Sequence, residues 1–414
     1  MPDIVLLVED VRDGTPFTLT DKFRAMCAPY PAHYHYEILE AYTSTIGNRI
    51  VFESIHNVVE FDPNKKYFYY IPLDHWNFDF VKYFQMLGKK TLENFQKHGV
   101  SILFAHDLEM VPTIDFPLFV KNLEWLYLLR SNYGHSDLNL VFAVANDLAN
   151  DQKIMLEQYF YNTFKFVCSP LIIKWAAAEL KKHIEIKFDD APKTKQFLCL
   201  NRGNRIHRII FLHGLRAYNL MNEGHISNMI PSRYDVNLIT SDTEYARRVK
   251  IDMSSDMPAM ILDDISNTSD NRPKSIPGVV PQMSETYYDI VSETAPSYFQ
   301  HAPIESAILT EKITKSLYLK RPFMINGGPG CLSKLKEYGF KTYDGLFDES
   351  YDNLNNFVDR HEVIIKNVIR YKNNISMLAE SVDRCKDTIE YNYDHLQRFG
   401  LMAESILADK LLRA

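Results

Sequence analysis

Residues 309–330 read LTEKITKSLYLKRPFMINGGPG and contain a complete signal for a helix, a strand and a turn. Charged residues at the start are followed by apolar residues spaced three and four apart, which is the period of an amphipathic helix. A short apolar run and a glycine-rich segment follow, and they predict a strand that ends in a tight turn. A helix that leads directly into an apolar strand is the repeating unit of a parallel α/β sheet, so this stretch predicts the fold class.

The same alternation extends outward from this stretch. In the second half, strands are predicted for FLCLNR, YYDIVSET and PFMING, with helices at RIHRIIFLHGLRAYNLM, TEKITKSLYLK and GPGCLSKLKEYG. The first half adds six predicted strands, DIVLLVED, NRIVFESI, KKYFYYIPLD, VSILFAHD, LNLVFAVAND and FKFVCSP. Helical spacing is found in FVKYFQMLGKKTLENFQKHG, PLFVKNLEWLYLLRS, DQKIMLEQYFYNTF and PLIIKWAAAELKKH. Strands that alternate with helices form a parallel sheet covered on both faces.

Length and one polar segment divide the chain into domains. Its 414 residues exceed what a single core ordinarily organises. The polar segment 186–196 contains a proline and follows a complete helix, so it is the predicted linker. We expect a Rossmann-like α/β domain over 1–190, a second over 191–352, and helices over 353–414 that pack back across the domains. The two sheets are expected to face a cleft, with ligands at the carboxyl ends of the strands.

Composition limits the class of protein. A content of 46% hydrophobic and 24% charged residues is that of a soluble globular protein. The net charge of -7 argues against a protein held on nucleic acid by its overall field. Five cysteines without a CxxC pair or a zinc spacing indicate free thiols in a reducing cytosol. The start of the chain lacks a signal-peptide pattern and no run approaches the roughly 20 apolar residues of a membrane span, so we expect a cytoplasmic protein, in the host cytoplasm if the source is viral.

The start of the predicted helix in the opening stretch has the residue types of an anion and diol site. Thr310 is a good N-cap, and unpaired amides and the helix dipole attract phosphate to that end. Lys312 adds a full positive charge in the first turn, and Glu311 can accept hydrogen bonds from a vicinal diol such as a ribose. The alternative is that Glu311 and Lys315 form a surface pair four residues apart.

A second basic turn occurs in FLCLNRGNRIHR, residues 197–208. The predicted strand ends at Asn201, and a glycine-containing turn leads into a helix, which lets the backbone approach an anion closely. Arg202 or Arg205 could grip a diphosphate with two hydrogen bonds, and His207 and Arg208 lie just inside the helix. The alternative is a solvated basic turn without a ligand.

The order of these motifs resembles the donor-binding half of GT-B glycosyltransferases. The strand followed by NR..R and a helix, then VSET, then TEKITKSLYLKRPFMINGGPG, is similar to fucosyltransferases that use GDP-fucose. The phrases FLCLNR..R.HR and GF.T....DESYD also look like those of glycosyltransferase-like proteins from tailed phages and bacteria. The likeness covers roughly residues 197–352, the fucosyltransferase pattern has no DESYD, and the first 190 residues match no family that we can name.

The resemblance implies roles for individual residues. In that family an Arg and the Lys of a Thr-Glu-Lys motif contact the diphosphate, and the Glu contacts the ribose. Carried over, Lys312 and Arg205 would bind the diphosphate, Glu311 the ribose, and Glu293 would lie near the donor sugar. The remaining members of the predicted donor-binding set are Asn201, Arg202 and Lys315. Because GT-B transferases generally work without a bound metal, the resemblance implies no metal and no cofactor beyond the nucleotide-diphosphate sugar, which is the donor substrate.

An inverting transfer also needs a general base on the acceptor hydroxyl. The resembling family places this base after a strand in the middle of the first domain, which favours Asp107 and Glu109 of SILFAHDLEM. Asp74, Glu9 and Asp10 follow other predicted strands and compete for the role. Any one of these acids could instead be a helix cap or a turn residue.

Two further segments carry weaker signals. NGGPG at 326–330 could let backbone amides meet a phosphate or a sugar, or it could be a tight turn without a ligand. FDESYD at 347–352 gathers the acids Asp348, Glu349 and Asp352, which could hold a divalent metal or form a solvated turn. Of the two interpretations of each segment, the sequence favours the turn.

These observations predict a glycosyltransferase that moves a sugar from a nucleotide-diphosphate sugar to an acceptor hydroxyl, without a metal and with inversion. The acceptor is a glycan or a hydroxymethylated pyrimidine in phage DNA. Two alternatives stay open: a nucleotide-sugar epimerase on the same scaffold, and a non-catalytic nucleotide-sugar binding protein.

Overall fold

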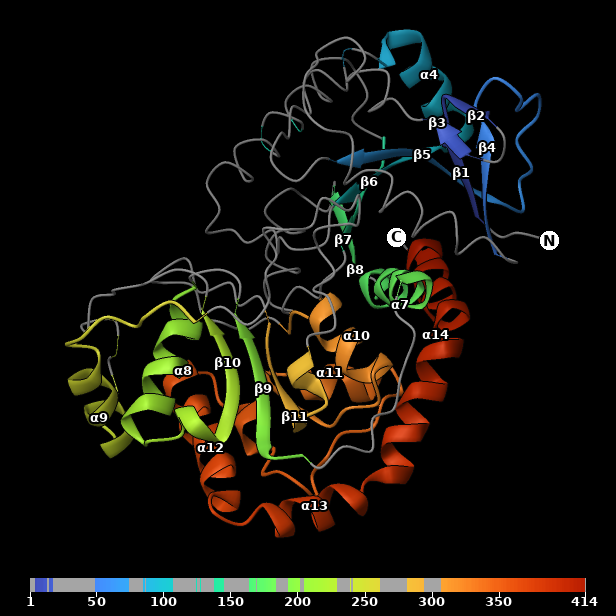
Figure 1. The fold of residues 1–414 in the computed structure, drawn as a ribbon. Helices are drawn as coiled ribbons and strands as arrows, with labels where there is room; N and C mark the ends of the chain where they lie inside the picture. Colours follow the sequence, from blue (N-terminus) through green and yellow to red (C-terminus); the bar gives the residue numbers. More distant parts are fainter. Residues whose placement is uncertain are drawn as a thin grey trace. The chain divides into compact units, whose positions relative to one another are not determined.

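The computed structural model divides the chain into two compact units, each described by itself (Figure 1). Unit 1 comprises Met1–Trp175 and Arg398–Ala414, and unit 2 comprises Ala176–Gln397. The structure describes residues 4–12, 15–17, 49–73, 85, 87–106, 124, 127, 138–144, 164–168, 170–183, 193–201, 205–228, 239, 241–260, 281–293 and 307–413. The division falls inside the helix α7 (Leu171–His183), upstream of the predicted linker at 186–196, and it assigns 353–397 to unit 2.

Unit 1 contains a six-stranded parallel sheet in the described part of the chain. Its strands are β1 (Ile4–Val8), β4 (Ile50–Ser54), β5 (Lys66–Leu73), β6 (Ser101–His106), β7 (Leu140–Val144) and β8 (Phe164–Cys168), in the order β4-β1-β5-β6-β7-β8. All six coincide with strands predicted from apolar runs, and every residue of β1 is fully buried, as expected of a sheet covered on both faces. A separate antiparallel pair is formed by β2 (Asp10–Arg12) and β3 (Thr15–Phe17).

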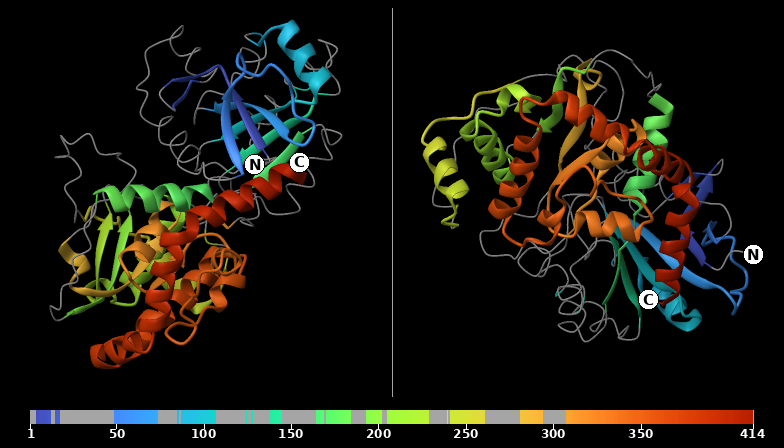
Figure 2. Two further views of the ribbon diagram at one scale, coloured as in Figure 1. Left: turned by 90° about the vertical axis from the view of Figure 1, so that its right-hand side faces the viewer. Right: turned by 90° about the horizontal axis from the view of Figure 1, so that it is seen from below.

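The described helices of unit 1 are α4 (Lys89–His98), the first part of α7, and the end of α14 (Lys386–Arg413). The helix α14 is long and continuous in both views of Figure 2. In its last turns Glu404 Oε1 accepts a hydrogen bond from the amide of Ile50 at 3.3 Å, at the start of β4. The helices predicted at 117–131 and 151–164 lie outside the residues that the structure describes, apart from isolated positions.

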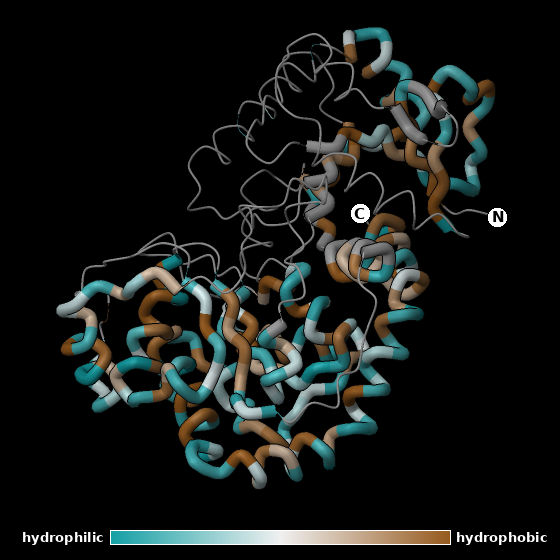
Figure 3. The backbone as a smooth tube through the Cα atoms, in the orientation of Figure 1, coloured by the Kyte–Doolittle hydropathy of each residue, from teal (hydrophilic) through white to brown (hydrophobic). Residues whose placement is uncertain are grey.

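Unit 2 contains a four-stranded sheet within the described residues, again all parallel. Its strands are β9 (Lys195–Asn201), β10 (Gly224–Asn228), β11 (Thr286–Ser292) and β12 (Phe323–Asn326), in the order β10-β9-β11-β12. The arrowheads of β9 and β10 point to the same end in Figure 1. Figure 3 shows apolar residues along β9, an inner strand of this sheet whose residues 196–199 are buried.

The helices of unit 2 follow its strands, and all of them except α9 were predicted. They are α8 (Ile206–Ala217), α9 (Glu244–Asp252), α10 (Glu311–Tyr318), α11 (Cys331–Glu337), α12 (Phe357–Tyr371), α13 (Ile375–Asp383) and the start of α14. Short 3-10 turns occur at Met221–Glu223, Pro281–Met283 and Ser350–Asn353. The helical C-terminal region is confirmed, and so is the fold class of two Rossmann-like parallel α/β sheets with C-terminal helices.

Candidate functional site

The strand order of unit 2 points to one place where a ligand can bind. The strands β9 and β11 are neighbours at the centre of the sheet. From β9 the chain passes through α8 outward to the edge strand β10, and from β11 it passes through α10 to β12 at the opposite edge. The connections therefore diverge beyond the carboxyl ends of β9 and β11. In open parallel sheets this topological switch point is where ligands bind. The helices that begin beside it are α8 and α10, the two helices to which the sequence assigned an anion site.

The four described strands of unit 2 each end in a short polar residue, a pattern that was not predicted from the sequence. Asn201 pairs with Asn228, and Ser292 pairs with Asn326. Since Leu198 pairs with Asp289 three residues earlier, Asn201 lies beside Ser292 as well. These four residues form one row across the carboxyl edge, and each is at most 2% exposed. Among the described residues the amide oxygen of Asn201, a buried acceptor at the switch point, has no partner.

Glu293 directly follows β11 and connects three elements around the switch point. Its backbone amide donates to Asn326 O at 3.0 Å, at the end of β12. Its carbonyl accepts from His207 Nε2 at 3.0 Å and from Arg208 Nη2 at 3.3 Å, both in the first turn of α8. Its carboxylate accepts from the amide of Thr310 at 2.9 Å and from the Thr310 hydroxyl, at the start of α10. The resemblance placed Glu293 near the donor sugar, but its fully buried carboxylate is engaged by α10.

The start of α10 carries the predicted diol and diphosphate residues. Thr310 is the N-cap, as predicted, and its hydroxyl accepts from the amide of Lys312 at 3.4 Å. Lys312 Nζ lies 2.8 Å from Glu311 Oε1 and 3.0 Å from Thr310 Oγ1. Glu311 is 9% and Lys315 4% exposed, so the alternative of a solvated surface pair does not fit this helix.

The start of α8 is built from the second basic turn. Arg205 is its half-buried N-cap residue, with extended backbone dihedrals. His207 and Arg208 are 1% and 4% exposed, and Arg208 Nη2 also donates to Ser292 O at 2.9 Å. These two side chains are therefore part of the packed edge of the sheet, not a solvated turn. Because both α8 and α10 hydrogen-bond to Glu293, the structure brings the two predicted basic segments to the same strand end.

A buried histidine on α12 also contacts the carboxyl edge of the sheet, and no sequence pattern predicted this contact. His361 Nε2 donates to Asn326 Oδ1 at 2.9 Å, and its ring lies 5.2 Å from that of Phe211. His361 Nδ1 and Asn326 Nδ2 are buried without a partner among the described residues. Such orphaned polar atoms at a strand edge are unusual in stable cores and mark sites for water or a ligand.

We expect the stability of unit 2 to fall as the pH drops below about 6.5. Burial lowers the pKa of His207 and of His361 well below the ordinary value, so both are neutral in the folded protein. The unfolded chain then binds more protons below that pH, and each histidine removes up to about 1.4 kcal/mol of unfolding free energy per pH unit. Urea unfolding at pH 7.5 and 5.5 measures this loss. His361→Gln should show a smaller loss, and an equal pH dependence in both proteins would contradict the assignment.

The glycine-rich segment 326–330 is held by unit 2 itself. Arg360 Nη2 donates to Gly327 O, and Arg360 Nη1 donates to Leu354 O at 2.8 Å. A Cβ at Gly327 would lie 3.1 Å from Glu293 Cβ, so the close approach of Glu293 leaves little room for a side chain there. Gly330 has a φ of 78° and its amide donates to Asp352 O at 2.8 Å. These contacts account for the segment as a turn.

The acids of 347–352 cap backbone groups. Asp352 is 5% exposed, and its carboxylate accepts from the amides of Leu332 and Ser333 at 2.8 and 2.9 Å, at the start of α11. Glu349 Oε1 accepts from the amide of Tyr343 at 2.6 Å. The predicted solvated turn is therefore wrong for Asp352, which is buried. Within the described residues no group of three His, Cys, Asp or Glu residues could hold a metal ion.

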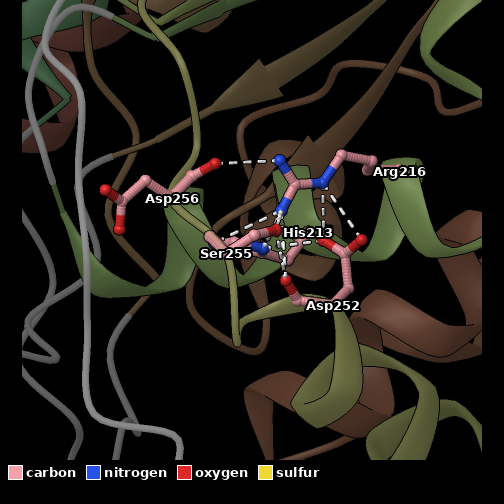
Figure 4. A network of polar contacts seen from close by, with 5 residues as sticks. All are labelled: His213, Arg216, Asp252, Ser255 and Asp256. Carbon is pink, nitrogen blue, oxygen red and sulfur yellow. Dashed lines mark hydrogen bonds and ion pairs between the residues drawn. The ribbon is translucent and has the colours of Figure 1, made fainter.

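A polar network away from the switch point joins α8 to α9 (Figure 4). His213 Nδ1 donates to Asp252 Oδ2 at 2.8 Å, and Arg216 Nε lies 2.8 Å from the same oxygen. Arg216 also donates to Ser255 Oγ at 2.8 Å and to Asp256 O at 2.9 Å. All of these donors are directed at the C-terminal end of α9, so the network fixes that helix end against α8.

Most of the remaining predicted residues belong to segments without a described structure. Arg202, Asp107 and Glu109 lie outside the described residues, as does the competing acid Asp74. Glu9 is described, and it follows β1 at the switch point of the sheet of unit 1, between β1 and β5.

Glu9 is held at that position from both neighbouring strands. The Tyr69 hydroxyl on β5 donates to Glu9 Oε1, and Ser54 Oγ at the end of β4 donates to Glu9 O at 3.2 Å. Burial, reinforced by Glu9, raises the pKa of Tyr69 well above its ordinary value, so the phenol keeps its proton and remains the donor. A half-buried carboxylate is thus oriented at the carboxyl end of β1 in the sheet of unit 1.

Comparisons with known proteins give one structural likeness. No protein-family model and no curated protein matches the sequence. Among solved structures, the chain is similar to a point mutant of T4 phage β-glucosyltransferase (BGT) in complex with UDP-glucose, with a TM-score of 0.38, 10% identity, and coverage of 98% of this chain and 99% of that chain. Within the described residues no helix is both long and apolar enough to span a membrane. The chain has two parallel Rossmann-like α/β sheets, each with its own topological switch point.

Proposed function

We propose that this protein is a GT-B glycosyltransferase that binds a nucleotide-diphosphate sugar at the switch point of unit 2. The observation that carries the proposal is the convergence of two predicted segments on Glu293. Arg205 at the start of α8 and the Glu311–Lys312 pair at the start of α10 both flank the end of β11. A cation from each helix supports binding of a diphosphate, and the carboxylate of Glu311 supports binding of a ribose diol.

The proposed reaction transfers the sugar with inversion. The oxygen of the acceptor hydroxyl attacks the anomeric carbon, and the bond from that carbon to the β-phosphate oxygen breaks. The nucleoside diphosphate leaves with the bonding electron pair, and Lys312 and Arg205 stabilise the developing charge without a metal. The proton of the acceptor goes to a carboxylate of unit 1, for which we propose Asp107 or Glu109.

The acceptor is a glycan or a hydroxymethylated pyrimidine in DNA. The net charge of -7 favours the glycan, because a DNA acceptor would need a local basic surface to offset it. If duplex DNA binds weakly even at low salt, and the affinity changes little with salt concentration, the result would support a glycan as the acceptor. An affinity for duplex DNA that falls steeply with salt concentration would support DNA as the acceptor.

A thermal-shift panel of UDP, GDP, CDP and dTDP sugars tests the proposal. The matching donor, at about 100 times its Kd, should stabilise the folded protein by about 2.7 kcal/mol. Nucleoside diphosphate should then accumulate slowly from hydrolysis and faster with an acceptor. Conversion of the nucleotide sugar to its epimer would instead identify an epimerase, and stabilisation without any turnover would identify a binding module. If none of the four classes stabilises the protein, the proposal is wrong.

A further inference from the structure

The start of α10 already holds an anion of the protein itself. The Glu293 carboxylate accepts hydrogen bonds from the amides of Thr310 at 2.9 Å and Ile313 at 3.4 Å. These are amides of the kind that a phosphate would use at a helix N-terminus. A diphosphate at this site therefore meets Lys312 and a helix end that an internal carboxylate has partly neutralised.

The hydroxyl of Thr310 links this carboxylate to the predicted diphosphate ligand. Thr310 Oγ1 donates to Glu293 Oε2 and accepts from Lys312 Nζ at 3.0 Å. If Glu293 is protonated, its carboxyl O–H can donate to Thr310 Oγ1 in place of Lys312. The ammonium group is then released from Thr310 toward the donor. The protonation state of a buried residue is thus connected, through one hydroxyl, to the position of Lys312.

The charged and titratable groups around Glu293 come from three helices. Lys312 and Glu311 face it from α10, Arg208 and the neutral His207 from α8, and Cys331 from α11. Burial raises the pKa of Glu293, Lys312 lowers it, and Glu311 raises it. A diphosphate that binds to Lys312 would both withdraw that stabilising cation and bring further negative charge. Both effects favour the protonated form of Glu293.

We propose that Glu293 is the positioning residue of the donor site and that it takes up a proton when the diphosphate binds. The inference rests on the proposed function, because it assumes that Lys312 binds a diphosphate. The proton comes from solvent and is bound by the Glu293 carboxylate, and no bond of the donor is made or broken in this step. Glu293 positions the site through its hydrogen bonds to α10 and α8, and it adjusts the charge at the site through its protonation.

Two variants separate the geometry of Glu293 from its charge. Glu293→Gln keeps the length and an acceptor oxygen for the amide of Thr310, but it cannot titrate. Glu293→Asp keeps the titrating carboxylate but shortens the side chain by one methylene. If the proposal holds, Glu293→Gln binds pyrophosphate as tightly as the wild type or up to about tenfold more tightly at pH 8, because a buried negative charge has been removed. Glu293→Asp should bind about tenfold more weakly and retain proton uptake.

Calorimetric titration with pyrophosphate, in two buffers of different ionisation enthalpy, measures the protons taken up on binding. The ligand and all other titrating groups are the same in each protein, so the difference between wild type and Glu293→Gln isolates Glu293. A larger uptake in the wild type supports the proposal. Equal uptake in both, or much weaker binding by Glu293→Gln in a folded protein, would overturn it. If the wild type binds neither pyrophosphate nor any nucleotide sugar, the proposed function itself fails, which is a distinguishable result.

Discussion

Lys312→Ala is expected to reduce the rate of sugar transfer by about a hundred- to a thousand-fold. That is the typical loss when one preorganised donor to a developing negative charge is removed. The ammonium group lies in the first turn of α10, 2.8 Å from Glu311 Oε1, and the side chain is 22% exposed. Because the side chain is partly exposed, the free energy of unfolding should change by less than about 1 kcal/mol. Release of nucleoside diphosphate and urea unfolding measure the two effects.

The matched control for this variant is Lys366→Ala on α12. Lys366 is 67% exposed and pairs with Glu362 at 2.9 Å one helical turn away, so it offers the same charge change without a place at the switch point. Its transfer rate should equal that of the wild type. A Lys312→Ala protein that retains wild-type turnover would remove the diphosphate role from this residue.

Arg321→Ala is expected to cost unit 2 about 3–5 kcal/mol of unfolding free energy, because it leaves a buried carboxylate without its ionic partner. Arg321 Nε donates to Asp289 Oδ1 at 2.8 Å, and the two side chains are 9% and 8% exposed. The same guanidinium donates to Met283 O at 2.7 Å and to Thr286 Oγ1 at 2.6 Å. It therefore ties the segment after α10 to the start of β11. Urea unfolding of the full chain measures the loss.

Two further variants test whether the loss comes from burial of the pair. Arg248→Ala removes an arginine from an exposed pair with Glu244 at 2.6 Å, and it should cost less than about 0.5 kcal/mol. The double variant Asp289→Leu with Arg321→Met should be more stable than Arg321→Ala, because no charge is left buried. An Arg321→Ala loss no larger than that of Arg248→Ala would show that the buried pair contributes little.

The apolar runs of the sequence predicted most strands because buried parallel strands need apolar residues on both faces. IVLLV in β1 and FLC in β9 are of this kind, and both are buried. The strand β10 was missed because GHISN has one strongly apolar residue, Ile226. Its strand conformation is stabilised by the pairing with β9, which the composition of GHISN does not indicate. Tertiary context overrides local propensity in such edge strands.

The sequence located the two helix starts of the candidate site, and the resemblance named Glu293, but neither predicted that Glu293 joins the two helices. Thr310 and Arg205 were found from local capping and turn patterns, which depend on adjacent residues. Glu293 caps α10 from 17 positions upstream, and His361 reaches Asn326 from 35 positions downstream. Such contacts follow from the order of strands in the sheet, which a single sequence does not specify. Asp352 was also misread as part of a solvated turn, because its carboxylate accepts from the amide of Leu332, 20 residues upstream, and such a contact leaves no local pattern.

The central claim is that a nucleotide-diphosphate sugar binds where α8 and α10 begin. Amide hydrogen exchange tests this most directly, with and without the nucleotide sugar that gives the largest thermal shift. We expect slower exchange in peptides that cover 205–212 and 310–317 and no change in the peptide that covers α13. Binding that protects other parts of unit 2 and leaves both helix starts unchanged would contradict the claim.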